Sequence, residues 1–272
     1  MMRALYTAAT GMIAEQTNVD TISHNLSNVN TNGYKTERTE FKSLLYQNIQ
    51  TRTTTANGEQ KPVGAQVGLG TRVAATTSMY TQGSMLASES DTDFAIEGEG
   101  FFAVRDMDGE VYYTRNGNFT WCMTNDGRTM LSDFEGRPVL DQNGNAIYVP
   151  EGIPTDNMRF SQTGAIGYIN ADEDYVDLGQ VFGIYQFNNP SGLEKLSSSR
   201  LMATAASGNP MLENGNANLN PSKVHQNYLE GSNVQVADEM VNMIIAQRAY
   251  QLNSKAITTA DSMLEIANNL KR

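Results

Sequence analysis

The first 29 residues carry a seven-residue repeat of apolar side chains. From Arg3 to Val29 there is no proline, and Gly11 is the one glycine. Leu5, Met12, Val19 and Leu26 recur every seven residues, and the companion position holds Ala8, Ile22 and Val29, with Glu15 as the exception. Such a heptad predicts an amphipathic helix that needs a partner helix. The stretch from Asn30 to Gly33 is a C-cap signal that is predicted to end this helix.

The last forty residues carry a second heptad. One seam position holds Asn242, Ala249, Ala256, Met263 and Leu270, and the other holds Ile245, Leu252, Thr259 and Ile266. Ser232 and Asn233 form the expected N-cap region, with Asp238 and Glu239 in the early turns, so the pattern predicts a helix of about 35 residues at most. Alanine at two seam positions permits close helix approach but leaves too little apolar surface for a stable isolated helix.

Between the two helices the apolar pattern has a period of two. We expect short strands, separated by Gly-containing turns, at residues 94–96, 101–105, 111–115, 119–123, 128–131, 138–140, 165–170 and 176–187. The predicted fold class is therefore α+β, with N- and C-terminal helices that pair in a coiled-coil-like manner and a central antiparallel β-rich domain. The expected domains are residues 1–35, a connector at 36–90 with a flexible stretch at 51–58, a β-rich domain at 91–221, and residues 222–272.

The negative charge of the chain is concentrated in its middle. The net charge is −11, yet residues 1–60 and 222–272 each contain five basic and five acidic side chains, which leaves 9 basic and 20 acidic residues in 61–221. This balance argues against a nucleic-acid partner and against anionic membranes. No apolar run exceeds four residues, so no membrane insertion is expected. Neutral ends can pack in many copies, although acidic residues could also serve only to solubilise the middle domain.

The motifs that could carry chemistry lack the context that chemistry requires. Gly98 to Ala103 matches G-x-G-x-x-A, but the chain is expected to continue as a strand instead of a helix, so turn glycines are favoured over a dinucleotide site. His24 and His225 have no neighbouring ligand set, and Cys122 is a lone cysteine. We therefore expect no enzyme activity, no cofactor and no metal. The N-terminus also lacks the apolar core of a secretory signal.

Three stretches of the chain carry recognisable motifs, namely Ile22–Lys35, residues 95–102 and residues 113–119. The first resembles the N-terminal signature of the bacterial flagellar rod and hook axial proteins, and the other two are similar to the middle domain of that family. The C-terminal signature is similar to residues 232–234, 239–244, 247–250, 253–255 and 261–264. Within the family, residues 41–47 and 63–73 resemble the proteins of the distal rod.

The resemblance implies a structural axial subunit of the bacterial flagellar distal rod. Such subunits self-assemble into a hollow helical drive shaft that transmits torque from motor to hook, with the terminal helices as an inner tube and the β domain outside. The implied partners are further copies of the chain, other rod and hook subunits, the bushing rings around the rod, and the flagellar type III export apparatus. The implied location is the basal body, reached without a cleaved signal. The alternatives are a proximal rod or hook subunit of the same family, and an unrelated β-domain enzyme.

The residues expected to carry self-assembly are the seam positions together with five polar side chains that would fix helix register. Buried polar residues set register at a cost in stability. The seam residues are Leu5, Met12, Val19, Ile22, Leu26, Val29, Asn242, Ile245, Ala249, Leu252, Ala256, Thr259, Met263, Ile266 and Leu270. The polar residues are Asn25, Asn28, Asn233, Gln247 and Arg248.

Overall fold

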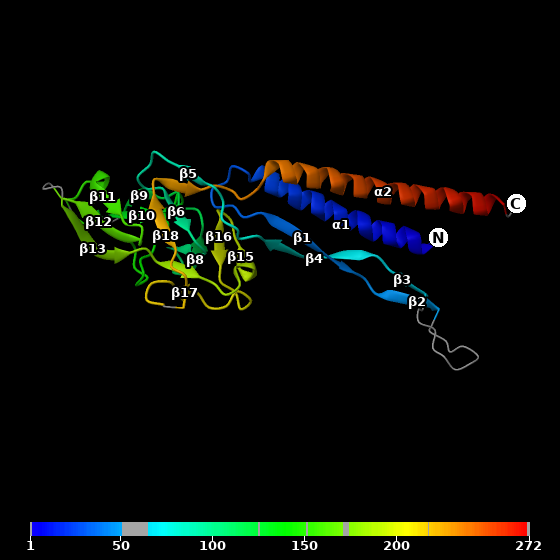
Figure 1. Cartoon of the computed structure of the whole chain (residues 1–272), viewed down its shortest axis with the longest axis horizontal. Coiled ribbons are helices and arrows are strands. Elements are labelled where there is room, and N and C mark those ends of the chain that lie inside the picture. Colours follow the sequence, from blue (N-terminus) through cyan, green and yellow to red (C-terminus); the bar gives the residue numbers. More distant parts are fainter. Residues whose placement is uncertain are drawn as a thin grey trace, which may run out of the picture. The chain divides into compact units, whose positions relative to one another are not determined.

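The computed structural model describes residues 2–50, 65–124, 126–150, 152–170, 174–216 and 218–270 (Figure 1). It contains a long helix near each end of the chain and a β-rich middle, so the predicted α+β class is confirmed. Residues 51–58, for which flexibility was expected, lie outside the described residues. The chain forms two compact units. The first consists of Met1–Ser27, Glu37–Ser78 and Gln235–Arg272, and the second of Asn28–Thr36 and Met79–Val234.

The two helices of the first unit contact each other and lie side by side, blue and orange-red in Figure 1. Helix α1 is Met2–Ser27 and helix α2 is Val236–Asn269. The predicted heptad ran to Val29, but the helix ends two residues earlier, where a turn begins with a hydrogen bond from the Thr31 amide to the Asn28 carbonyl. A difference of this size is usual for helix ends.

The predicted N-cap of the second helix is wrong. The residue that precedes α2 is Gln235, which makes no side-chain cap. The side chain of Asn233 is instead bonded to the backbone at Thr36 and Met79, so it is not available to the first turn of α2. Asp238 and Glu239 do lie in that first turn, where acidic side chains stabilise a helix by interacting with the partial positive charge of its N-terminus.

Two antiparallel strand pairs complete the first unit. Strand β1 (Glu37–Ser43) pairs with β4 (Thr71–Ser78), starting from Glu37 opposite Ser78, and both strands contact α1. Strand β2 (Tyr46–Gln50) pairs with β3 (Ala65–Gly68). The segment between the first helix and the central domain is therefore not only a linker, because much of it is paired backbone. Helix α1 consequently packs against α2 and against a strand pair.

The second unit is built around a six-stranded antiparallel sheet with the order β15-β16-β8-β7-β14-β17. These strands are β7 (Phe101–Arg105), β8 (Val111–Thr114), β14 (Ile184–Gln186), β15 (Glu194–Lys195), β16 (Arg200–Met202) and β17 (Met211–Leu212). Smaller antiparallel sheets join β11-β12-β13, β9-β10, β6-β18 and β5-β19. Their bounds are β5 (Met85–Ala87), β6 (Phe94–Glu97), β9 (Thr120–Met123), β10 (Thr129–Ser132), β11 (Met158–Phe160), β12 (Ala165–Ile169), β13 (Tyr175–Val181), β18 (Lys223–Gln226) and β19 (Tyr228–Glu230). Two short 3₁₀ helices cover Thr155–Asn157 and Pro190–Gly192.

Most of the predicted strands are present, and two differ in instructive ways. Residues 138–140 form isolated bridges instead of a strand. The predicted strand at 176–187 is two strands, β13 and β14, because the strand is interrupted at Gly183. A Cβ atom at that glycine would lie 2.6 Å from the Asp141 carbonyl oxygen, so the backbone passes too close for a side chain.

Aromatic side chains fill the core of the second unit. The Phe94 ring is fully buried, and its centroid lies 4.5 Å from that of Phe160 and 5.0 Å from that of Phe182. Trp121, the sole tryptophan, packs against the same cluster. A second cluster, around Phe101 and Tyr113, lies on the opposite face of β7, because Phe101 and Ala103 alternate along the strand with Phe102 and Val104 of the first cluster. The two clusters form the hydrophobic core of the second unit.

Candidate self-assembly surface

Small side chains bring α1 and α2 close together. Ala8 and Ala14 are buried in α1, and Ala246 and Ala260 are buried in α2. At Gly11 an added Cβ would lie 2.8 Å from the Nδ2 atom of Asn253, so the two helix backbones approach closely at this level. Contacts of this kind bury little apolar area per residue, because alanine and glycine carry few apolar atoms.

The heptad predicted for α2 lies one residue away from the positions that are most buried. Ile245, Leu252 and Ile266 are 61%, 68% and 61% exposed, whereas the residues that follow the first two, Ala246 and Asn253, are buried and half-buried. One residue corresponds to a rotation of about 100° around a helix. The predicted seam is therefore an open stripe beside the α1 contact. Of its other members, Ala249 is half-buried, and the exposed ones are Asn242, Ala256, Thr259, Met263 and Leu270.

The predicted seam of α1 is more buried than that of α2, because α1 has packing partners on two sides. Ile22 is 5% exposed. Half-buried positions are Leu5, Met12, Val19 and Leu26, and Val29 is half-buried in the second unit. The sequence reading missed a neighbouring stripe in which Tyr6 and Ile13, seven residues apart, are each 68% exposed. The seven-residue spacing of these two apolar residues was the sequence signal that could have predicted this stripe.

Asn25 is a buried, fully hydrogen-bonded polar side chain of the first unit. It is 1% exposed, and its Oδ1 atom accepts a hydrogen bond of 2.9 Å from the Glu37 amide. Its Nδ2 atom donates to the Glu37 carbonyl at 2.8 Å and to Glu239 Oε2 at 3.3 Å. One side chain thus joins the end of α1 to the start of β1 and to the first turn of α2.

The other predicted polar residues have different surroundings. Asn233 accepts a 2.7 Å hydrogen bond from the Thr36 amide and donates to the Met79 carbonyl at 2.8 Å, all within the second unit. Asn28 accepts a hydrogen bond of 3.1 Å from the Thr31 hydroxyl. Gln247 and Arg248 are exposed on α2. The structure therefore places three asparagines in contacts within the chain and leaves the other two side chains facing outward.

The second unit also contains a buried cluster of charged side chains that the sequence analysis did not predict. Its central residue, Glu230, lies three residues before Asn233. Lys35 Nζ is 2.5 Å from Glu230 Oε1, and Arg115 Nη1 is 3.0 Å from Glu230 Oε2. The exposed fraction of the side chain is 4% for Lys35, 3% for Arg115 and 0% for Glu230. Burial lowers the pKa of Lys35, as does the Arg115 charge, and the Glu230 carboxylate opposes them. No sequence signal could have found this cluster, because its members are isolated charges far apart in the chain.

Comparison with known proteins accounts for the two helices and the β module together. Residues 5–35 match the family model "Flagella basal body rod protein", residues 95–168 match "Flagellar hook protein FlgE/F/G D1 domain", and residues 225–270 match "Flagellar basal body rod FlgEFG protein C-terminal". Flagellar basal-body rod proteins FlgG are similar over full length: 44% identity in Borreliella burgdorferi, covering 100% of both chains, and 40% in Agrobacterium fabrum, covering 99% of this chain and 100% of the relative. The chain belongs to the flagellar basal-body rod FlgEFG family.

Members of this rod family are structural, and this chain is a structural axial subunit of the flagellar basal-body rod, not an enzyme. The Gly98–Ala103 motif agrees with that assignment, because it leads into β7 and not into a helix. Among the described residues, no three His, Cys, Asp or Glu side chains gather as metal ligands. Neither α1 nor α2 has a stretch apolar enough to cross a bilayer.

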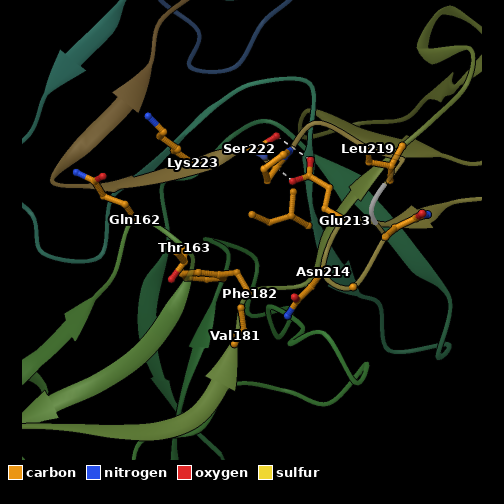
Figure 2. Close-up of a pocket in the computed structure, with 13 residues that line it drawn as sticks. Gln162, Thr163, Val181, Phe182, Glu213, Asn214, Leu219, Ser222 and Lys223 are labelled. Atoms are coloured by element: carbon orange, nitrogen blue, oxygen red, sulfur yellow. Dashed lines mark hydrogen bonds between the residues drawn. The ribbon is translucent and has the colours of Figure 1, made fainter.

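The second unit has a hollow of about 780 Å³, shown in Figure 2 between the turn at Gln162 and Thr163 and the loop that follows Glu213. The Glu213 carboxylate accepts hydrogen bonds from the Ser222 amide and hydroxyl, both at 2.7 Å, and from the Gln186 amide at 2.7 Å. Both oxygens of this carboxylate therefore hold the loop in place.

Proposed function

We propose that this chain is a subunit of the distal part of the rod and that its copies polymerise through their terminal helices into a hollow helical drive shaft. The shaft transmits torque from the motor to the hook. Identical subunits joined head to tail by a contact that does not close form an open helical filament. Such a filament becomes stiff when many helices interlock.

The observation that carries this proposal is the open apolar stripe on α2. Ile245, Leu252, Met263 and Ile266 are each more than half exposed, although the adjacent stripe of the same helix packs against α1. Burial of such a side chain stabilises a contact by about 1.5–3 kcal/mol. A stripe of four or more therefore favours association with another copy over exposure to water. The stripe comprises Ile245, Ala249, Leu252, Ala256, Met263 and Ile266 and is called the outer stripe below.

Coiled-coil-like pairing of α1 and α2 is part of the proposal. Most of the buried and half-buried positions of α2 follow a heptad, with steps of four and three residues that are interrupted at the exposed Tyr250. These positions are Glu239, Met243, Ala246, Asn253, Ile257, Ala260 and Leu264, whereas the half-buried Ala249 and Ser254 lie outside the repeat. Two heptad stripes one residue apart let α2 contact α1 on one side and a neighbouring copy on the next.

The charge distribution supports the proposed arrangement in the filament. The neutral terminal segments would form the inner tube, where many copies meet at close range, and the acidic middle would face outward. Further partners under this proposal are the other rod and hook subunits and the bushing rings around the rod. Delivery by the flagellar type III export apparatus rests on the family membership.

Electron microscopy of the concentrated full chain tests the proposal. We expect tubular filaments from the wild-type protein and none from Leu252→Asp, because a carboxylate in the outer stripe would be buried without a partner. Thr258→Asp is the matched control: Thr258 is exposed on α2, and Glu265 occupies the same heptad position one repeat later. Normal filaments from Leu252→Asp would refute the role of the stripe.

The position along the axis needs its own measurement. Gold labelling of an exposed tag on isolated basal bodies should mark the rod segment adjacent to the hook. Label at the opposite end of the rod, or on the hook itself, would instead assign the chain to the proximal rod or to the hook.

A further inference from the structure

The chain crosses four times from one compact unit to the other. The segments of the second unit that lie next to these crossings contact one another. They are residues 28–36, which follow α1, residues 79–84, and residues 230–234, which precede α2. These three segments are called the neck. The sequence separation between Lys35 and Glu230 is 195 residues, so contacts within the neck join the roots of the two helices.

Backbone and amide hydrogen bonds connect the three neck segments. The Gly33 amide donates to the Glu230 carbonyl at 2.8 Å, and the Met79 amide donates to the Thr36 carbonyl at 2.9 Å. Asn233 bridges Thr36 and Met79 through the two ends of its side-chain amide, at 2.7 and 2.8 Å. Each segment is therefore bonded to both of the others.

The carboxylate of Glu230 lies at the centre of the neck. Besides Lys35 and Arg115 it binds the Gly83 amide at 3.0 Å, and Lys35 also donates to the Thr81 carbonyl at 2.8 Å. All of these groups belong to the second unit. Breaking a buried ion pair by removing one partner leaves an uncompensated charge, so a half-formed cluster is strongly disfavoured. The cluster is consequently either complete, with both helix roots attached, or open.

The helices themselves provide little that would bring them together. Ile22 is the one large apolar side chain among the buried residues of the two helices, and Met243, Ile257 and Leu264 of α2 are only half-buried. Two weakly interacting elements pair far more readily when their ends are held close, because the effective concentration of one at the other rises.

We infer that Lys35, Glu230 and Arg115 form a clasp that holds the roots of α1 and α2 together and so makes their pairing efficient within one chain. The inference rests on the proposed function, since it supplies the paired helices that the filament uses. The clasp is a conformational device and not merely part of the β core. It closes only when residues from both ends of the chain have arrived.

An intramolecular cross-link measures the effect of the clasp directly. Cysteines replace Gly11 and Asn253 in a full-length Cys122→Ser chain; the second replacement removes the atom that a Cβ at Gly11 would contact. The rate of disulfide formation under mild oxidation, in dilute protein, reports how readily α1 meets α2. Glu230→Gln and Lys35→Met should each slow this rate about tenfold or more. Arg200→Gln, which removes a partly buried ion pair with Asp106 outside the neck, should leave it unchanged.

Fluorescence of Trp121 during urea unfolding reports separately whether the second unit is folded. A slower cross-link with the Trp121 transition retained supports the clasp. An unchanged rate overturns it. If Glu230→Gln abolishes the transition, Lys35→Met decides, because it leaves Glu230 bonded to Arg115 and the Gly83 amide. Loss of the transition in both variants also overturns the clasp, since the cluster would then serve the β core.

The cross-link is intramolecular and is measured in dilute protein, so its result does not depend on filament formation. A wild-type chain that cross-links rapidly but forms no filaments would leave the clasp intact and contradict the proposed polymerisation. If the wild-type chain formed filaments but substitution of Lys35 or Glu230 left the cross-linking rate unchanged, the proposed polymerisation would stand and the clasp would be contradicted.

Discussion

Asn25 of α1 and Glu239 of α2 join the two terminal helices by a hydrogen bond of 3.3 Å between amide nitrogen and carboxylate oxygen. Both residues are buried, at 1% and 8% exposure. An amide is well suited to this place because it also donates to the Glu37 carbonyl and accepts from the Glu37 amide. The Asn25 side chain therefore joins α1 both to the first turn of α2 and to the start of β1.

Asn25→Asp should destabilise the first unit. The new carboxylate would face Glu239 and could no longer donate to it or to the Glu37 carbonyl, at a cost of about 1–3 kcal/mol. Urea unfolding followed by the helical circular dichroism signal measures the change. Asn30→Asp makes the same chemical change at an exposed position and should shift the midpoint little. Equal midpoints for the two variants would exclude a role for Asn25 in register.

Phe94→Ala should lower the stability of the second unit by about 3–5 kcal/mol, because it removes a fully buried ring that packs against Phe160 and Phe182. Trp121 fluorescence during urea unfolding follows this unit. Phe134, which is 60% exposed, provides the control, since Phe134→Ala removes the same atoms from the surface. A loss of similar size in both variants would contradict the assigned core.

The stability of the second unit should fall in alkaline solution as Tyr113 ionises. Burial, with a smaller contribution from Tyr185, raises the pKa of Tyr113 to about 12 from its usual value near 10. A raised pKa means that the folded state holds its proton more tightly than the unfolded state. The stabilisation is therefore complete below about pH 10 and is lost as the pH rises towards 12.

Denaturant midpoints measured between pH 9 and 12 test this pH dependence. Tyr113→Phe carries no phenol, so its midpoint should fall less steeply over the same range. Parallel curves for wild type and Tyr113→Phe would show that Tyr113 is not the group responsible.

Gly33→Ala should weaken the neck more than an ordinary glycine substitution would. Gly33 has a φ of 69°, and an added Cβ would lie 2.7 Å from the Arg115 carbonyl carbon. The left-handed conformation alone costs about 1–2 kcal/mol for a residue with a side chain. Gly127→Ala isolates that cost, because Gly127 has a φ of 78° with nothing within 4 Å. Urea unfolding followed by Trp121 fluorescence measures the loss of stability in both variants. The amount by which the loss for Gly33→Ala exceeds that for Gly127→Ala gives the cost of the close contact.

The sequence predicted both helices and most central strands, but it misplaced the contact surface of α2 by one residue. Hydrophobicity marks Ile245 and Leu252 as seam residues, whereas the helix contact is made by Ala246 and Asn253, which are small or polar. A heptad shows that a helix has a partner, but it does not say which of two adjacent stripes meets which partner. In a chain that assembles, the more apolar stripe can be left for the neighbouring copy.

The strands of the first unit could not be read from the pattern of side chains. In β1 only Thr39 is buried, so the strand has no alternation of apolar and polar residues. The charge cluster was equally invisible, because Lys35, Arg115 and Glu230 are ordinary surface residue types until the fold brings them together. Turns with Gly, by contrast, marked the hairpins of the second unit directly.

Residues 85–229 leave the neck after Ser84 and return to it at Glu230, and these two ends lie close together, because the Gly231 amide donates to the Ser84 carbonyl at 2.8 Å. In evolutionary terms this segment behaves as an insertion between two nearby ends. Extra residues in one of its surface turns leave both ends in place, whereas one residue added within either helix rotates everything beyond it by about 100°. Relatives of different length should therefore differ inside this segment and keep the helices at constant length.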